Sequence, residues 1–532
     1  MERVLVANRG EIALRVFRSA RALGLATAAV VAPDDLGSLH ARSADETVEV
    51  TSYLDPLEQI RAARAAGADA IHPGYGFLAE NAEFAELATA AGLTWIGPPA
   101  DALRRGGDKL EAKRIAATAD VPTIPDATEP PLIVKAAAGG GGRGMRVVRS
   151  RSELDAALEA ARREAASAFG DDRVYLERLV ERPRHVEIQL LADAHGTIVS
   201  LGERDCSVQR RHQKVLEESP SPALDPELRQ RMGAAAVRFA RAIGYVGAGT
   251  AEFMLEGRDF FFLELNGRIQ VEHPVTEAVT GLDLVEWQLR IARGERLGAG
   301  DRPPNGHAVE ARLYAEDPRS FLPQAGRIER LRLPGSIRVD AGVEEGDEIG
   351  TSYDPLIAKL IASGPTRTSA LDRLAAGLAE TEVEGVTTNL PFLRWLVAHP
   401  VVRAGEATTA FLTDYPPLSA PPPRRPAAPW RGAFRLNLPS PSPQAPPDID
   451  ADANAHGSGE ESSVVSAPMP GTVIKVLVRS GAAVRAREPL VVLEAMKMET
   501  PLLSPFDATV RTVHVREGDR VAGGAVLVEL DD

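Results

Sequence analysis

The pattern of apolar and polar positions changes character along the chain and divides it into parts. Short apolar runs at 3–7, 26–32, 70–73 and 94–98 are typical of strands, and Ile12, Val16 and Leu23 have the spacing of an amphipathic helix over 11–23. Strands that alternate with helices predict a parallel sheet covered by helices in residues 1–107. From about residue 108 to about residue 415 the pattern predicts a mixed α+β region, with a long helix over 152–168.

The C-terminal segment 464–532 contains an internal repeat of short strands. Alternating Val and Leu, separated by Gly-containing turns, occupy 468–493 and again 505–530. The two copies predict a small quasi-symmetric all-β sandwich, with 494–500 as the turn between its halves. Lys497 lies in this turn between two methionines, where a lysine is presented for modification. The matched pairs are Thr472 and Thr509, Val473 and Val510, Val476 and Val513, Gly481 and Gly518, Val484 and Val521, and Leu490 and Leu527.

Residues 416–463 differ in composition from the parts on either side. Pro, Ala, Ser and Asp dominate this stretch, which predicts a linker that is semi-extended at its prolines and flexible over 448–463. One apolar island, WRGAFRLNL at 430–438, interrupts it. The island is either a docking strand or the remnant of a further domain, and the sequence does not decide between the two.

Length and charge narrow the possible classes of protein. A chain of 532 residues is expected to fold as three or four domains, and its net charge of −14 argues against general binding to nucleic acid or to an anionic membrane. No apolar run approaches the roughly 18 residues of a membrane span, and the N-terminus leads directly into a strand, so we expect neither a span nor a signal peptide. The lone Cys206 excludes an intrachain disulfide and favours the cytoplasm. We expect it to be a small buried apolar residue.

A glycine-rich run at 139–144 lies between two apolar strands, and Lys135 precedes it. Glycines allow backbone amides to close around phosphate oxygens, and the lysine adds a positive charge for the same anion. The run lacks the GK[ST] of a Walker A loop and does not open a helix as GxGxxG does. The alternative is a flexible glycine loop that binds no ligand.

Two carboxylates are predicted to face each other across a hairpin centred on Arg258. This pairing sets Glu252 opposite Glu264, with Asn266 two residues further along. Two carboxylates and an amide oxygen are suitable ligands for Mg²⁺ that bridges ATP phosphates. The alternative, a pair of solvated carboxylates, is disfavoured because Glu264 follows an apolar run.

The segment after this hairpin carries three further polar side chains. Arg268 and Gln270 are predicted on one side of a strand, where a guanidinium and an amide suit a planar oxyanion such as bicarbonate. Glu272, two residues after Gln270, is predicted on the same side of the strand and is a candidate general base. The alternative is a polar strand face that is open to water.

Several longer motifs occur in an order that resembles the biotin carboxylase family of ATP-grasp enzymes. The likeness runs from residue 1 to about 415, and EAMKMET at 494–500 resembles the biotinylation site of biotin carboxyl carrier domains. Together the two parts resemble the α chain of a bacterial acyl-CoA carboxylase of the acetyl- or propionyl-CoA type. The motifs are HPGYGFLAEN at 72–81, KAAAGGGGRGM at 135–145, RPRHVEIQ at 182–189, ERDCSVQRRHQKVLEE at 203–218 and ELNGRIQVEHPVTE at 264–277.

The resemblance implies a role for each matched residue. Glu272 is the implied base that deprotonates bicarbonate, Arg268 and Lys214 are implied catalytic residues, and Arg338 in GSIRVDAG is the implied arginine that steadies the biotin enolate. Lys497 is the implied site of covalent biotin. The implied nucleotide-binding residues are Lys109, Lys135, Gly140, Gly141, Gly142, Glu177, His185, Glu187 and His212. The implied metal ligands are Glu252, Glu264 and Asn266, and the implied bicarbonate site is Arg268, Gln270 and Val271.

The reaction implied by the resemblance is the ATP-dependent carboxylation of biotin on the chain's own carrier domain. Bicarbonate is activated as carboxyphosphate, with ATP and Mg²⁺ (or Mn²⁺) as cofactors, and the glycine-rich region closes as a lid. Carboxybiotin is then supplied to a separate carboxyltransferase (β) subunit, and a biotin protein ligase is the second implied partner. The family further suggests a homo-oligomer. A subunit of a pyruvate carboxylase or of another biotin-dependent carboxylase is the alternative acceptor class.

The expected architecture is a multidomain α/β and α+β protein that ends in an all-β biotinyl/lipoyl-type sandwich. The expected parts are a parallel-sheet domain at 1–107, an ATP-grasp domain at 108–315 with a lid at about 123–175, and a C-terminal carboxylase domain at 316–415. The linker at 416–463 and the carrier domain at 464–532 follow.

Four departures from the family pattern affect the expected details. Ala138 stands where a glycine is usual, Gly267 replaces a bulkier residue and is expected to loosen the bicarbonate segment, and the connector 123–132 is short. Most of a carboxyltransferase-docking domain is missing before the carrier. None of these departures removes a charged catalytic group.

Two other classes of protein remain as competing hypotheses. One is a carrier and scaffold whose ATP-grasp part is inactive, which the intact set of Lys135, Glu264, Arg268 and Glu272 disfavours. The other is a lipoyl carrier fused to a different ATP-grasp ligase, which the methionines beside Lys497 disfavour.

Overall fold

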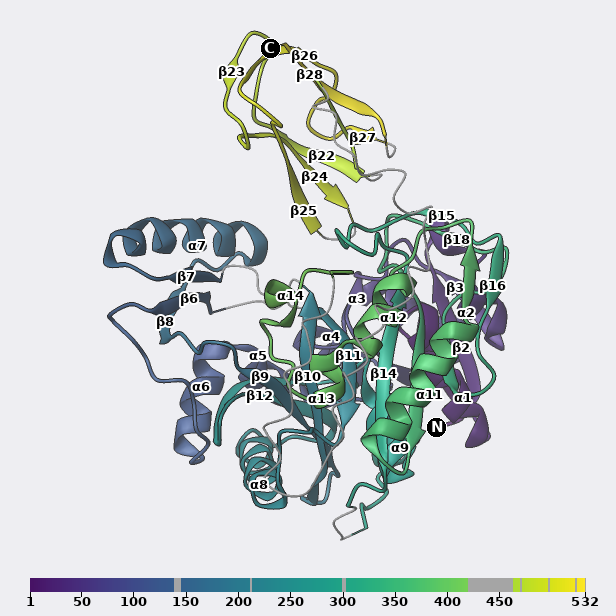
Figure 1. The fold of residues 1–532 in the computed structure, drawn as a ribbon. Helices are drawn as coiled ribbons and strands as arrows, with labels where there is room; N and C mark the ends of the chain where they lie inside the picture. Colours follow the sequence, from purple (N-terminus) through teal and green to yellow (C-terminus); the bar gives the residue numbers. More distant parts are fainter. Residues whose placement is uncertain are drawn as a thin grey trace, which may run out of the picture.

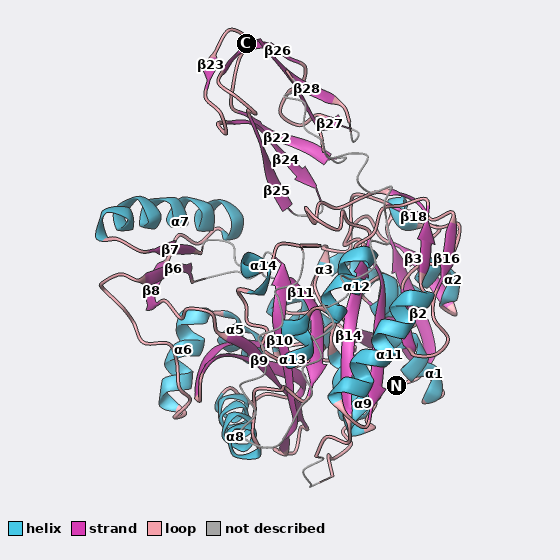
Figure 2. Ribbon diagram, viewed as in Figure 1, coloured by secondary structure: helices cyan, strands magenta, loops and turns pink. Residues whose placement is uncertain are grey.

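The computed structural model describes residues 1–137, 145–210, 213–298, 303–419, 463–468, 471–495, 498–521 and 524–531. Figure 1 shows a large body made of helices and sheets, with the small C-terminal β domain beside it in yellow and yellow-green. Figure 2 shows that this small domain contains strands and loops, whereas the large body mixes helices with strands. The predicted fold class is confirmed.

The N-terminal domain is built on a parallel sheet in the order β3-β2-β1-β4-β5. Both faces of the sheet are covered, since Leu5 packs with residues of α3 and α4 whereas Val6 packs with residues of α1. Strands buried on both faces are apolar throughout, which is why they appear as continuous apolar runs in the sequence. The edge strand β3 was not expected, because its residues are mostly exposed and polar. The elements are β1 (Arg3–Val6), α1 (Gly10–Ala22), β2 (Ala26–Val31), η1 (Pro33–Asp35), α2 (Leu39–Ser43), β3 (Glu46–Glu49), α3 (Pro56–Ala65), β4 (Ala70–His72), α4 (Ala82–Ala90), β5 (Thr94–Trp95) and α5 (Ala100–Gly107).

β6, β7 and β8 form a small antiparallel sheet in the order β7-β6-β8, and the glycine-rich run lies between β6 and β7 in the sequence. Helix α7 packs on this sheet through Leu154 and Ala161, and it begins after a capping box formed by Ser150 and Glu153. The predicted helix over 152–168 is therefore present, while residues 138–144, with Ala138 and the glycines, lie outside the described residues. The elements are α6 (Lys109–Thr118), β6 (Leu132–Ala136), β7 (Arg146–Val148), η2 (Arg151–Glu153), α7 (Leu154–Phe169) and β8 (Val174–Arg178).

One eight-stranded antiparallel sheet forms the centre of the large body, in the order β13-β12-β9-β10-β11-β14-β19-β17. β11 pairs with β14, and β14 pairs with β19, so strands of the predicted ATP-grasp domain at 108–315 and of the predicted C-terminal domain at 316–415 are hydrogen-bonded into a single sheet. The elements on the ATP-grasp side are β9 (Arg184–Ala192), β10 (Ile198–Arg210), β11 (Gln213–Ser219), α8 (Pro226–Ala242), β12 (Gly247–Glu256), β13 (Asp259–Asn266), α9 (His273–Thr280) and α10 (Leu284–Ala292).

The C-terminal part of the large body packs helices against β14 and β19. Leu313, Leu360, Leu374 and Phe392 belong to its core. The elements are β14 (His307–Tyr314), β15 (Gly326–Arg327), β16 (Arg330–Arg332), β17 (Arg338–Ala341), β18 (Glu348–Ile349), β19 (Leu356–Gly364), α11 (Arg367–Glu380), β20 (Glu382–Glu384), α12 (Leu390–Ala398), α13 (Pro400–Ala404) and α14 (Phe411–Asp414). Among the described helices, none is both long enough and apolar enough to cross a bilayer.

The carrier domain consists of two four-stranded sheets, β21-β28-β26-β23 and β25-β24-β22-β27. The repeat seen in the sequence maps strand onto strand, because β22, β23 and β24 correspond to β26, β27 and β28 at the same offset. The matched pairs Val473 with Val510 and Leu490 with Leu527 are all buried in its core, so the repeat preserves core positions. The elements are β21 (Val464–Ser466), β22 (Gly471–Val476), β23 (Ala483–Val484), β24 (Pro489–Ala495), β25 (Met498–Leu503), β26 (Ala508–Val513), β27 (Arg520–Val521) and β28 (Val526–Asp531).

The turn of the carrier domain is tighter than the predicted 494–500. Ala495 pairs with Met498, so β24 and β25 extend to within two residues of each other. Lys497 lies between these paired residues and outside the described part of the chain.

Candidate active site

Two carboxylates and one amide meet on the hairpin of β12 and β13. Glu252 and Glu264 are register partners, as predicted, and a bulge next to Phe253 brings them into register. The turn pairs Glu256 with Asp259, and that register alone would have placed Glu252 opposite Leu263. Asn266 Nδ2 donates to Glu252 Oε1 at 2.9 Å.

The three groups fit a divalent cation. Burial raises the pKa of the Glu264 carboxyl, and the facing Glu252 raises it further, while Lys109 acts in the opposite sense. Lys109 Nζ lies 3.7 Å from Glu264 Oε2 and makes only a loose ion pair. A divalent ion at Glu252, Glu264 and Asn266 would relieve the repulsion between the two carboxylates, so this donor set suits Mg²⁺ or Mn²⁺.

Lys214 on β11 is the central cation of the site. Its Nζ lies 2.8 Å from Glu252 Oε1 and 2.7 Å from Glu272 Oε1, and it also donates to Glu187. Burial lowers the pKa of this ammonium, but the three carboxylates outweigh burial and raise the pKa well above its usual value. Lys214 therefore remains charged and connects the predicted metal ligands to the predicted base.

Residues 267–272 form a loop, which corrects the predicted strand. β13 ends at Asn266 and α9 starts at His273, so the side chains converge through loop geometry and not through strand alternation. Arg268 Nη2 donates to Asn266 Oδ1 at 2.8 Å, and Gln270 Nε2 donates to Glu252 Oε1 at 2.9 Å. The space beside Gly267 is filled by Leu103, whose Cδ2 would lie 2.7 Å from an added Cβ.

Two residues that the sequence reasoning did not assign hold this loop in place. Glu80 accepts from Gly267 N and from Arg268 Nε, each at 3.0 Å. Arg204, which is fully buried, donates to Gln270 Oε1 at 3.1 Å and to Glu187 Oε1 at 2.5 Å. Both residues lie inside the quoted motifs, but neither spacing nor periodicity indicates what they contact.

Arg312 on β14 is the second cation beside Glu272. Its Nη2 lies 2.8 Å from Glu272 Oε2 and 2.5 Å from Glu217 Oε1. Burial alone would raise the pKa of Glu272, but Lys214 and Arg312 hold this pKa well below its usual value. Glu272 is therefore ionised, as a base must be before it accepts a proton.

Arg338, the arginine predicted to act beside Glu272, makes its contacts elsewhere. Its Nη1 lies 2.8 Å from Glu277 Oε2 and its Nη2 lies 2.7 Å from Asp340 Oδ2. Arg338 is on the edge strand β17, two strands away from β14, and it lines an open hollow of about 660 Å³ with Arg15. The structure thus brings Arg312 to Glu272, whereas Arg338 lines the hollow, because β14 and β17 occupy different places in the sheet.

The described residues predicted to bind nucleotide form ion pairs on two sheets, the small sheet for Lys135 and Glu177 and the eight-stranded sheet for His185 and Glu187. Lys135 Nζ lies 2.7 Å from Glu177 Oε2, and His185 Nε2 lies 2.8 Å from Glu252 Oε2. Glu187 is fully buried between Arg204 and Lys214, and burial raises the pKa of its carboxyl. The predicted residues Gly140, Gly141, Gly142, His212 and Lys497 lie outside the described residues.

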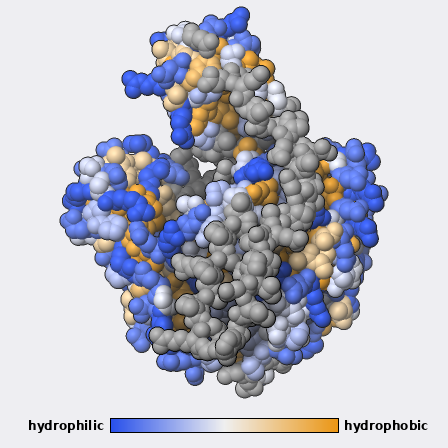
Figure 3. All heavy atoms as spheres, in the orientation of Figure 1, coloured by the Kyte–Doolittle hydropathy of each residue, from blue (hydrophilic) through white to orange (hydrophobic). Residues whose placement is uncertain are grey.

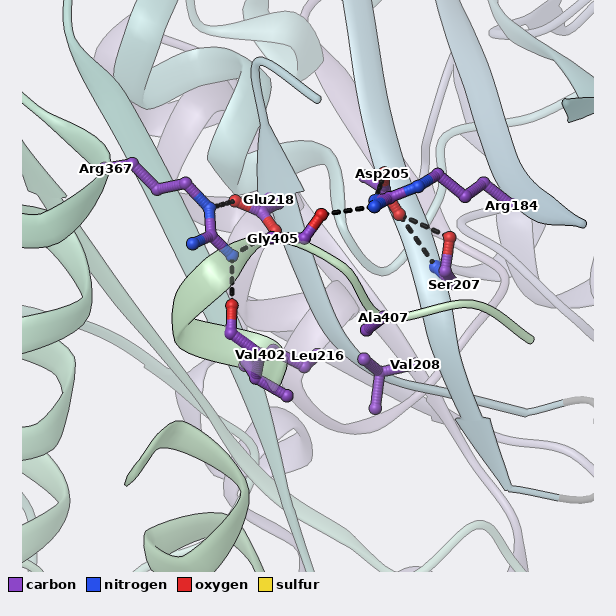
Figure 4. A pocket seen from close by; sticks show the side chains of 10 residues that line it. All are labelled: Arg184, Asp205, Ser207, Val208, Leu216, Glu218, Arg367, Val402, Gly405 and Ala407. Carbon is purple, nitrogen blue, oxygen red and sulfur yellow. Dashed lines mark hydrogen bonds and ion pairs between the residues drawn. The ribbon is translucent and has the colours of Figure 1, made fainter. Parts of the chain in front are cut away.

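Cys206 and a small pocket complete the surroundings of the site. Cys206 is fully buried, as predicted, and burial raises the pKa of its thiol. Figure 4 shows the pocket between Arg184 and Arg367, where Arg367 pairs with Glu218 and Arg184 pairs with Asp205. Its free volume of about 10 Å³ is enough for about one water and not for a nucleotide.

The fold and this site define an ATP-grasp ligase joined to a biotinyl/lipoyl-type carrier domain. The chain is 46% identical over 441 residues to the biotin carboxylase of Halalkalibacterium halodurans, an alignment that covers 78% of this chain and 98% of that protein. The chain therefore belongs to the biotin carboxylase family, as predicted.

Family models agree with this assignment over four segments. They match the biotin carboxylase N-terminal domain at 1–103, the carbamoyl-phosphate synthase L chain ATP-binding domain at 108–299, the biotin carboxylase C-terminal domain at 310–414 and a biotin-requiring enzyme domain at 463–530. The predictions of a biotin carboxylase with its own carrier domain and of biotin, ATP and Mg²⁺ as cofactors are confirmed at this level.

Longer relatives and solved structures share the carboxylase part. The propionyl-CoA carboxylase alpha chain of Ruegeria pomeroyi is 46% identical over 78% of this chain and 68% of that protein. The methylcrotonoyl-CoA carboxylase alpha subunit of Rattus norvegicus is 47% identical over 78% of this chain, which spans only 62% of that relative. The Hydrogenobacter thermophilus 2-oxoglutarate carboxylase biotin carboxylase domain, solved with MgADP, ADP and bicarbonate, has a TM-score of 0.76 and 43% identity over 78% of this chain and 98% of that one.

Proposed function

We propose that this chain uses ATP and bicarbonate to carboxylate the biotin carried on its own Lys497. The observation that carries the proposal is the convergence of Lys214 and Arg312 on the buried Glu272, beside the opposed carboxylates of Glu252 and Glu264. A buried base next to a divalent-cation site is the arrangement that deprotonation of bicarbonate and phosphoryl transfer require.

Each step then uses named groups of the chain. Glu272 accepts the proton of bicarbonate, whose oxygen attacks the γ-phosphorus of ATP to give carboxyphosphate and ADP. Arg268 and Gln270 orient the planar anion, and Lys109 and Lys135 balance charge on the phosphates. Mg²⁺ held at Glu252, Glu264 and Asn266 would supply further charge neutralisation. Carboxyphosphate breaks down to CO₂ and phosphate, and the phosphate takes the ureido proton of biotin as nitrogen attacks CO₂.

The basicity of Glu272 depends on its two cations. Lys214 and Arg312 depress the pKa of Glu272 while both cations contact it. An anionic substrate that draws Lys214 or Arg312 toward itself weakens this effect, so substrate binding makes Glu272 a stronger base.

We propose that Arg338, which lines the open hollow with Arg15, stabilises the biotin enolate, and that Arg312 holds the base Glu272. Arg338→Met is expected to reduce biotin carboxylation by roughly a hundredfold, because a fixed positive charge on developing negative charge contributes about that much. ADP release in the absence of biotin should change much less in this variant, whereas Arg312→Met should impair it, since Arg312 contacts Glu272. Carboxylation of free biotin and ADP release without biotin by both purified variants test this assignment, and parental biotin carboxylation by Arg338→Met would contradict it.

Removal of divalent cations is expected to stop ATP turnover. EDTA should abolish bicarbonate-dependent ADP release, and added Mg²⁺ should restore it. Glu264→Gln should raise the Mg²⁺ concentration needed for half-maximal rate by about tenfold or more, because one anionic ligand is lost. Glu256→Gln on the same hairpin is the matched control, since Glu256 pairs with Arg178. Equal Mg²⁺ requirements in both variants would contradict this metal assignment.

The carboxylated biotin is proposed to serve a separate carboxyltransferase subunit. A biotin protein ligase is the proposed enzyme that attaches biotin, and the cytoplasm, where ATP is available, is the proposed compartment. An acyl-CoA acceptor is favoured by the named propionyl- and methylcrotonoyl-CoA carboxylase relatives. The similarity to the 2-oxoglutarate carboxylase domain keeps an oxo-acid acceptor as the second candidate.

A homo-oligomer of the carboxylase part is also proposed. Light scattering of the purified protein tests this oligomer, and copurification of the partner with a panel of acceptors tests the acceptor class.

Exposed apolar residues are consistent with a carrier domain that must dock to other surfaces. Val464, Leu477, Leu503 and Val526 are each more than one third exposed. Figure 3 shows apolar residues on the carrier domain next to hydrophilic ones.

The direct test of the proposed function is a coupled ATPase assay with purified protein. We expect ADP release that requires bicarbonate and rises when free biotin is added. An avidin blot should detect the native protein. ATP turnover that ignores bicarbonate would overturn the proposal, and absent ATP binding in calorimetry would favour an inactive scaffold.

A further inference from the structure

Two buried side chains bind the backbone carbonyls just before Glu272. His273 Nδ1 donates to the Gln270 carbonyl at 2.7 Å, and Lys359 Nζ donates to the Val271 carbonyl at 3.0 Å. Burial holds the pKa of His273 well below its usual value, so its ring is neutral and Nδ1 carries the proton that the carbonyl accepts. These two hydrogen bonds therefore hold the proposed bicarbonate-binding loop at two consecutive peptide units.

Lys359 is an unusual residue for its strand. It lies on β19 between Ala358 and Leu360, and like both of them it is fully buried. An ammonium is costly to bury unless it is paired and hydrogen-bonded, so a lysine here requires specific partners. None of the proposed catalytic steps uses its charge.

The partners of Lys359 come from the N-terminal domain. Its Nζ lies 3.1 Å from Glu11 Oε2, and Tyr75 donates its hydroxyl to Glu11 Oε1. Glu11 is in the first turn of α1, which approaches the C-terminal part so closely that a Cβ at Gly342 would lie 2.7 Å from Glu11 N. Lys359 therefore connects three separate segments of the chain: the start of α1, strand β19 and the loop before the base.

We propose that Lys359 is a positioning residue for bicarbonate activation, with Glu11 as its counter-ion and the Val271 carbonyl as its target. This inference rests on the proposed function. Lys359 touches no substrate in this scheme. It fixes the peptide between Val271 and Glu272, and so fixes where the Glu272 carboxylate and the Gln270 side chain point.

The kinetic test is Lys359→Met, which keeps the side-chain length and removes the ammonium. We expect kcat/KM for bicarbonate to fall roughly tenfold to a hundredfold, because a small misplacement of a catalytic group has effects of this size. KM for ATP should change much less, because the nucleotide residues lie on other strands. If kcat/KM for bicarbonate and kcat/KM for ATP fell by the same factor, the defect would be a general structural one, and the proposal would be overturned.

The rescue test uses the buried pair itself. Lys359→Met leaves the Glu11 carboxylate buried without its cation, so Glu11→Gln combined with Lys359→Met should be more stable than Lys359→Met alone. The double variant should keep the bicarbonate defect, because the Val271 carbonyl still lacks its donor. A double variant with parental bicarbonate kinetics would overturn the proposal even if Lys359→Met alone fails to fold.

Hydrogen exchange separates this inference from the proposed function. In Lys359→Met or in the double variant, amides of residues 270–273 should exchange faster than in the parent, while exchange in β12 stays the same. Arg42→Met is the matched control, because Arg42 joins α2 to Glu344 and Asp347 of the C-terminal part without touching this loop. Unchanged exchange over 270–273 would overturn the proposal, whereas a parent without bicarbonate-dependent turnover would overturn only the proposed function.

Discussion

Glu272→Gln is expected to reduce bicarbonate-dependent ATP turnover by about a hundredfold to ten-thousandfold, the range that a positioned general base contributes. The amide keeps the shape of the side chain, but its single oxygen can accept from only one of Lys214 and Arg312, and it cannot take the proton of bicarbonate. Steady-state ADP release at saturating ATP and bicarbonate measures this effect.

The control for this variant is Glu203→Gln, another buried glutamate. Glu203 pairs with Arg229 through bonds of 2.7 and 3.0 Å and contacts none of the residues around Glu272. Glu203→Gln is expected to lower stability while it leaves turnover per folded molecule close to that of the parent. Parental turnover in Glu272→Gln would show that another group, or the bound phosphate, acts as the base.

Lys497→Ala is expected to abolish attachment of biotin and, with it, carboxylation of the carrier domain. The carboxylase part should still carboxylate free biotin, because the cluster around Glu272 is unaffected. Tethering raises the local concentration of biotin to the millimolar range for a short flexible link, so the variant should need free biotin at comparable concentrations. Intact-mass measurement and an avidin blot report the attachment, and transfer of labelled bicarbonate reports the reaction.

Lys475→Ala provides the matched control, since Lys475 is the other lysine of the carrier domain and is exposed. It should be biotinylated and carboxylated like the parent. Biotin retained in Lys497→Ala, or lost in Lys475→Ala, would contradict the assignment of the modified lysine.

Much of the fold was predictable because its signals are local. Apolar runs identified the parallel strands of the N-terminal sheet. The repeat identified corresponding strands in the two halves of the carrier domain, and their matched residues, such as Val473 and Val510, are core positions. The hairpin that carries Glu252 and Glu264 was also predictable, since its turn lies between two alternating stretches. Each of these features depends on residues that are close in sequence.

Other features were not predictable because they depend on contacts between distant residues. The segment 267–272 alternates like a strand, yet the nearby start of α9 and the contacts of Glu80 and Arg204 hold it as a loop. The joining of β11 to β14 in one sheet also has no local signal, since some ninety residues separate the two strands. Nothing in either strand alone specifies which neighbour it pairs with.

By itself, the sequence determined the class of protein and the order of its parts, and it predicted the lysine of the carrier domain and most of the charged residues of the candidate site. Tertiary structure alone decided which charges meet. Lys214 contacts three carboxylates, and Arg312, not Arg338, reaches Glu272, because β14 lies next to β11 whereas β17 lies at the edge of the sheet. Motifs specify which side chains are present, but ion pairs over a few ångströms are determined by strand order and burial, which only the folded chain establishes.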